Sequence, residues 1–76
     1  MEYLLELQWT DPVASAVARI LSALPDGMEP TTSVLPPGTS RAFEVLRVNS
    51  PAALTELVDA ITGCGAEVLV IGARAT

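Results

Sequence analysis

The sequence predicts an α+β domain with the element order β-α-β-β-α-β. Two helix starts of the same construction indicate it, because Asp11-Pro12 and Ser50-Pro51 each place a residue of the N-cap type before a proline. Each pair follows a strand-like segment and precedes apolar residues at helical spacing. The 76 residues are therefore expected to form two β-α-β halves of one domain, residues 1–76.

The first half opens with an alternating segment, residues 2–10. Its apolar residues on one face are Tyr3, Leu5, Leu7 and Trp9, a pattern typical of a half-buried strand. Asp11 is then expected to cap a helix whose first residue is Pro12. The helix carries one apolar stripe, made of Val13, Val17, Ile20, Leu21 and Leu24.

After the stop signal Pro25-Asp26-Gly27, residues 28–35 are expected to form an edge strand, because Pro30 has no N–H to donate. Residues 36–40 suit a hairpin connection without phosphate-binding spacing. Residues 41–48 predict a central strand that is partly covered on both faces, with Phe43 and Val45 on one side and Leu46 and Val48 on the other.

The second helix begins at Ser50-Pro51, and Gly63 and Gly65 are its stop signals. Its apolar stripe consists of Leu54, Leu57, Val58 and Ile61. Seven residues of the two stripes are expected to be buried against the sheet: Val17, Ile20, Leu21, Leu54, Leu57, Val58 and Ile61. Residues 68–71 form a fully apolar fourth strand, and residues 73–76 a frayed tail.

Right-handed crossovers place both helices on one face of a four-stranded antiparallel sheet, with the first and third strands central. This is the ferredoxin-like fold. The other sheet face is expected to be partly open, with Leu4 and either Leu69 or Ile71 exposed on it. An apolar face on so small a protein favours a partner, and we expect a homodimer or a higher homo-oligomer formed through this face or an edge strand.

Charge and composition exclude several classes of function. Nine acidic residues against four arginines give a net charge of −5, which disfavours nucleic acid and anionic membrane surfaces as partners. No segment has the pattern of a signal peptide or a membrane span, so a soluble, cytoplasmic protein is expected. We expect no cofactor and no metal, because the single cysteine, Cys64, has no histidine to join it and fits a helix-to-strand turn.

Two classes of function remain. The first is a non-enzymatic, self-associating regulatory or assembly module, for which no catalytic residues are assigned. The alternative is a small enzyme with a carboxylate-based site on the open sheet face or at a subunit interface.

The candidate ligand site is the junction of the first strand and helix, where helix N–H groups could bind a small anion such as a carboxylate. Its residues are Trp9, Thr10, Asp11, Pro12 and Val13. The competing interpretation is that Asp11 occupies those N–H groups as a cap and that Trp9 belongs to the core.

The loop Asp11-Pro12-Val13 and the helix from Ala18 to Leu24 resemble the ACT domain, a small regulatory module with the same order of elements. The glycine that the family carries in this loop is absent here, and the spacing from Pro12 to Arg19 is longer than in the family. The resemblance implies side-by-side pairing of domains and binding of a small molecule, such as an amino acid, near Asp11.

Overall fold

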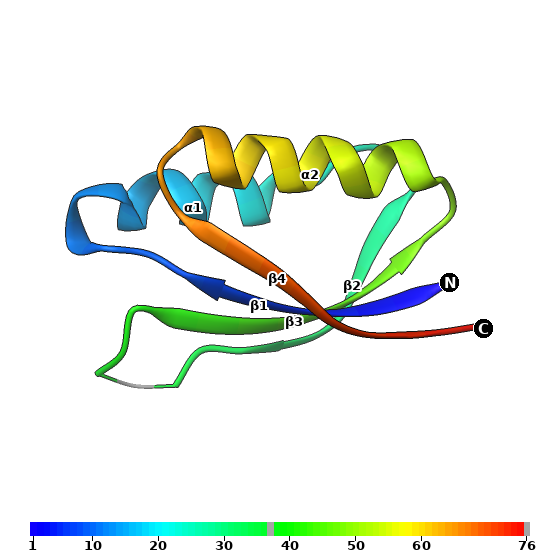
Figure 1. Ribbon diagram of the computed structural model, residues 1–76, viewed down its shortest axis with the longest axis horizontal. Coiled ribbons are helices and arrows are strands. Elements are labelled where there is room, and N and C mark those ends of the chain that lie inside the picture. The colour runs from blue at the N-terminus through cyan, green and yellow to red at the C-terminus, as the bar shows by residue number, and fades with distance from the viewer. Residues whose placement is uncertain (37, 76) are drawn as a thin grey trace.

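The computed structural model describes residues 1–36 and 38–75, and it confirms the α+β, ferredoxin-like fold (Figure 1). Pro37, in the predicted hairpin connection, and Thr76, in the predicted tail, lie outside the described residues. The elements in chain order are β1 (Glu2–Gln8), a 3-10 turn η1 (Asp11–Val13), α1 (Ala14–Ser22), β2 (Met28–Val34), β3 (Arg41–Val48), α2 (Pro51–Gly63) and β4 (Glu67–Arg74).

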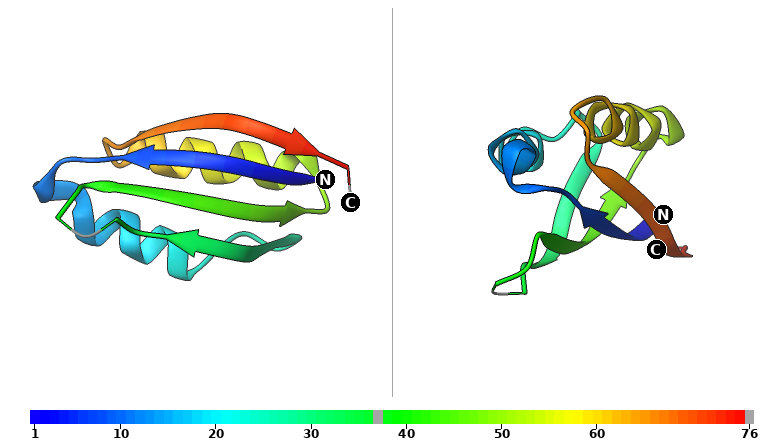
Figure 2. Two further views of the ribbon diagram at one scale, coloured as in Figure 1. Left: turned by 90° about the horizontal axis from the view of Figure 1, so that it is seen from below. Right: turned by 60° about the vertical axis from the view of Figure 1, so that its left-hand side comes forward.

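The four strands form one antiparallel sheet in the order β2-β3-β1-β4. The first and third strands are central, as predicted, and the strand containing Pro30 lies at an edge. Figure 2 (left) shows the sheet from its uncovered side, with both helices behind it. The sheet therefore has one face covered by helices and one open face.

Alternation along β1 decides which side chains enter the core. Leu5 and Leu7 are fully buried, and Tyr3 and Trp9 pack against the same cluster. Cross-strand pairing carries the pattern into β3, where Leu46 lies opposite Tyr3. The helix-covered face of the sheet is therefore the one that the spacing of β1 predicts.

The helices bury less of their apolar stripes than the sequence predicts. Val17, Leu57 and Ile61 are buried, whereas the other four of the expected set, Ile20, Leu21, Leu54 and Val58, are half-buried. α1 has nine residues and α2 has thirteen, so together they form a short layer whose flanks remain open to solvent. The prediction of complete burial was wrong for these four residues.

The first helix does not start as predicted. Asp11 begins a 3-10 turn instead of capping an α-helix, and Thr10 holds the N-cap position with no hydrogen bond from its side chain. A 3-10 turn closes after three residues, so its first N–H donor is Val13, which bonds the Thr10 carbonyl over 3.0 Å. At α2 the prediction of Ser50 as N-cap and Pro51 as first residue is confirmed, although the Ser50 hydroxyl caps nothing.

The fourth strand is longer than predicted. Ala73 and Arg74 belong to β4, where they pair with Tyr3 and Glu2, instead of to a frayed tail. One irregularity interrupts the pairing, because Leu4 lies opposite Gly72 while Leu5 lies opposite Val70. Ile71 is thus the extra residue of a bulge, and such a bulge twists an edge strand locally.

Replacing Gly65 should destabilise the end of α2. Gly65 has a φ of +99°, and its N–H donates to Thr62 while the Ala66 N–H donates to Ile61, which is the Schellman arrangement. Gly65→Ala is expected to cost about 1–2 kcal/mol because a Cβ disfavours the left-handed region. Thermal unfolding measures this loss.

Gly63→Ala is the matched control, because Gly63 is in the last helical turn and a Cβ there meets no atom within 4 Å. It is expected to leave stability unchanged or to raise it by about 0.4–1 kcal/mol. Equal melting temperatures for the two variants would contradict the role given to Gly65.

Candidate functional site

The open sheet face carries several exposed or half-buried apolar side chains. Val34 and Leu69 are exposed at 49% and 58%, and Leu4, Phe43 and Val45 are half-buried beside them. Leu4 and Val45 are cross-strand partners, as are Val34 and Phe43, so these side chains form adjoining rows across the strands. Leu4 lies on this face as predicted, and of the two alternatives Leu69 and Ile71, the register places Leu69 on it, opposite Glu6.

One end of the open face is crossed by a row of alternating charge. Glu29, Arg47, Glu2 and Arg74 lie opposite one another on β2, β3, β1 and β4 in that order. Two ion pairs join neighbours in this row, Arg47–Glu29 at 3.8 Å and Arg74–Glu2 at 2.6 Å. We refer to these four residues as the charged row.

A third ion pair lies farther along the face. The Arg41 Nε lies 3.3 Å from a carboxylate oxygen of Glu6, a residue whose cross-strand partner on β4 is Leu69. Glu6 thus places its charge between apolar side chains, and Arg41 compensates it. The open face therefore combines apolar rows with paired charges.

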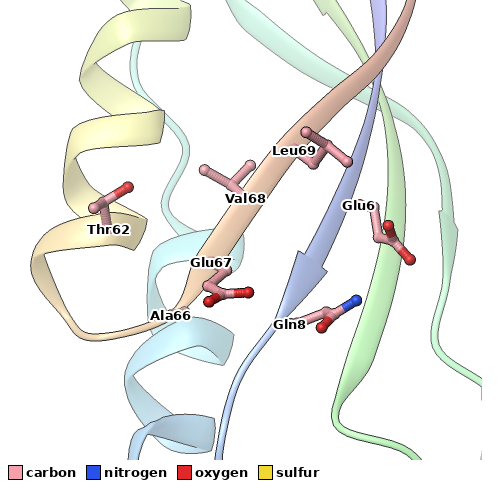
Figure 3. A pocket seen from close by; sticks show the side chains of 7 residues that line it. All are labelled: Glu6, Gln8, Thr62, Ala66, Glu67, Val68 and Leu69. Carbon is pink, nitrogen blue, oxygen red and sulfur yellow. The ribbon is translucent and has the colours of Figure 1, made fainter.

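Two hollows lie along β1 and β4. One of about 400 Å³ is formed by side chains of β1, β4 and the last turns of α2, including Gln8, Glu67 and Leu69 (Figure 3). The other, of about 310 Å³, lies at the opposite end of the sheet beside Leu4 and Arg74. Both open widely to solvent, as surface grooves do.

The five predicted ligand-binding residues occupy the connection from β1 to α1. Trp9 is half-buried against the core, and its backbone N–H donates to the backbone carbonyl of Ser40 over 3.1 Å. Thr10, Asp11 and Pro12 are exposed, and Val13 is half-buried near Gly65. A hollow of about 210 Å³ is lined by Gln8, Trp9, Thr10, Gly65 and Glu67, so it includes two of the five.

Glu44 is a buried acidic residue that the sequence interpretation did not single out. It is only 4% exposed and lies on the helix-covered face of β3, where its cross-strand partners are Leu5 and Ser33. The Ser33 hydroxyl donates to its carboxyl oxygen over 2.7 Å. The one signal in the sequence was its spacing of two from Ala42 and Leu46, both of which are buried.

Removing the Ser33 hydroxyl should destabilise the domain. Ser33→Ala takes away the donor to a carboxyl group that is largely out of water, at an expected cost of about 1–2 kcal/mol. Ser33→Thr keeps the donor and suits a strand, so it should retain stability close to the original. Urea unfolding compares the two, and a Ser33→Ala protein as stable as Ser33→Thr would show that the hydrogen bond contributes nothing.

Cys64 is half-buried at the end of α2, where its thiol contacts the Ile61 carbonyl over 3.1 Å. Its backbone N–H and those of Gly65 and Ala66 close the helix by donating to carbonyls of the last turn. The environment is that of the helix-to-strand turn that the sequence predicts.

Comparison with protein-family models, with curated proteins and with solved structures finds no match. Within residues 1–36 and 38–75, no helix has the length and apolar character needed to cross a membrane.

Proposed function

We propose that this protein is a self-associating regulatory or assembly module rather than a catalyst. The observation that carries the proposal is the open sheet face with its β4 edge. Leu69 is 58% exposed on that face, and the neighbouring residues Val70 and Ile71 are also exposed along this edge strand. A run of exposed apolar residues at a sheet edge invites association with another chain. A domain of 76 residues also gains stability from such association, since its own core is small.

The charged groups of the open face support a structural role. Glu2, Glu6 and Glu29 each form an ion pair with an arginine, so their oxygens are engaged in contacts within the sheet. A binding surface benefits from such pairing, because charges that are already compensated cost less to cover.

Sedimentation velocity over a range of micromolar protein concentrations tests the proposal. A sedimentation coefficient that rises with concentration to the value of a dimer or larger oligomer is the expected result. A monomer at every concentration would overturn the proposal, because the open sheet face would then remain exposed in the functional state.

A second candidate is binding of a small amino acid at the β1–α1 junction, which the hollow beside Trp9 and Thr10 favours. The carboxylate of Glu67 lines this hollow and suits an ammonium group, and the Thr10 hydroxyl makes no cap bond and can donate to a ligand carboxylate. The resemblance to ACT domains supports an amino acid as the ligand.

A thermal-shift screen against the common amino acids tests this binding. One amino acid should raise the melting temperature, and Thr10→Ala and Glu67→Gln should each reduce that shift, while Glu56→Gln, at an exposed position of α2 outside this hollow, should not. An unchanged melting temperature with every amino acid would refute the site without affecting the proposal of self-association.

A further inference from the structure

The open sheet face is complementary in charge to a second copy of itself. We infer that two copies associate face to face through it, with the two-fold axis running along the strands. This inference rests on the self-association proposed above and adds to it the surface and the geometry.

The distribution of charge is compatible with contact through this face. The open face holds three of the four arginines, Arg41, Arg47 and Arg74, and four of the nine acidic residues, Glu2, Glu6, Glu29 and Glu67, so its net charge is −1. The remaining side chains, with one arginine and five acids, carry −4 of the total of −5. Of that −4, the α-helices themselves carry only Arg19, Glu56 and Asp59, and the rest lies on Asp11, Asp26 and the buried Glu44. Contact through the sheet faces therefore brings together only −1 from each copy and keeps most of the negative charge away from the interface.

The charged row matches its own image under this symmetry. An axis along the strands places β2 over β4 and β3 over β1 of the second copy. Glu29 then faces Arg74 of the second copy, and Arg47 faces Glu2 of the second copy. Four positions of alternating sign give four contacts of opposite charge, and long flexible side chains accommodate the rotation of about 30° between packed sheets.

The other two-fold axis that stacks the faces lacks this match. An axis across the strands reverses each strand over its own copy. Arg47 would then face Arg41 of the second copy on β3, and Arg74 alone among the charged row would meet an opposite charge, Glu67 of the second copy on β4. Two arginines held in a closing interface repel each other, which disfavours that arrangement.

The size of the face makes the charged row part of the contact. Strands of seven and eight residues in four rows span roughly 25 by 19 Å, or about 500 Å² in projection. A stable dimer buries about 800 Å² of accessible surface on each partner. Nearly the whole face must then be used, including the charges at its end.

Charge reversal at the two ends of the charged row tests the inference. Glu29→Arg sets arginine against Arg74 of the second copy, and Arg74→Glu sets glutamate against Glu29 of the second copy. Each variant alone is expected to weaken the dimer roughly 10- to 100-fold. An equimolar mixture should form heterodimers with a dissociation constant within a few-fold of the original, because both contacts then join opposite charges.

Glu56→Arg and Arg19→Glu make the same changes of charge on the helix layer and should leave association unchanged. Circular dichroism verifies that all four variants are folded. If two copies instead paired along the β4 edge, residue 29 would lie at the far edge of the sheet, and only Arg74→Glu would weaken the dimer. If they paired along the β2 edge, only Glu29→Arg would weaken it.

Either of those results, or weakening without recovery on mixing, would overturn the face-to-face geometry. An original protein that dimerises while neither charge reversal weakens it would overturn this inference and leave self-association standing. A monomeric original protein would overturn both.

Discussion

Leu57→Ala is expected to lower the free energy of unfolding by about 2–5 kcal/mol, because it removes a large side chain from the centre of the core. Leu57 is fully buried in the middle of α2 and belongs to the cluster that includes Leu5, Leu7 and Leu46. A domain of this length has roughly 4–11 kcal/mol of stability in total. The variant should therefore lose a large share of its stability and melt at a clearly lower temperature.

Val58→Ala is the matched control, since Val58 is the next residue of the same helix and is only half-buried. Its expected cost is about 1 kcal/mol or less. Denaturant unfolding at several protein concentrations separates the stability of the fold from that of any oligomer. Equal losses for the two variants would show that α2 is rotated relative to the sheet.

Leu69→Lys is expected to weaken self-association at least about a hundredfold. Burial of a leucine side chain contributes about 1.5–3 kcal/mol, and a two-fold interface contains this position twice. Each 1.4 kcal/mol corresponds to a factor of ten in the dissociation constant. Because Leu69 is exposed on the open face, the fold of the single chain should be retained.

Ala18→Lys on the exposed surface of α1 introduces the same charge away from the sheet and serves as the control. Both substitutions reduce the net negative charge, so a general effect of charge repulsion would strengthen association in both. Sedimentation velocity on the two variants measures how strongly each one still self-associates. An undiminished dimer in Leu69→Lys would show that the open face is not the contact.

The alternation of β1 and the proline of β2 made the sheet predictable. Apolar side chains spaced by two assign Leu5 and Leu7 to the core, and Pro30 can be tolerated only where a ladder hydrogen bond is dispensable. The position of Glu44 follows from the same spacing, but its charge argued against burial. The hydroxyl that satisfies it comes from another strand, so it could be recognised only once the register was known.

The charged row could not be predicted from the sequence for the same reason. Glu2 and Arg74 are 72 residues apart, and their contact depends on the pairing of the first strand with the last. The bulge at Ile71 sets that register, and its one local signal is Gly72 within a strand. The start of α1 was mispredicted because Asp11-Pro12 suits the first residues of a 3-10 turn as well as those of an α-helix.

The pairing of Glu2 with Arg74 also fixes where the chain ends emerge. β1 begins and β4 finishes at the same end of the sheet, so Met1 and Ala75 lie near each other (Figure 1). A two-fold axis along the strands keeps that end on one side, so all four chain ends of a dimer would emerge at a single pole. Any protein joined to either end would thereby be held beside its counterpart, and association of this small module would act as a device for bringing two attached partners together.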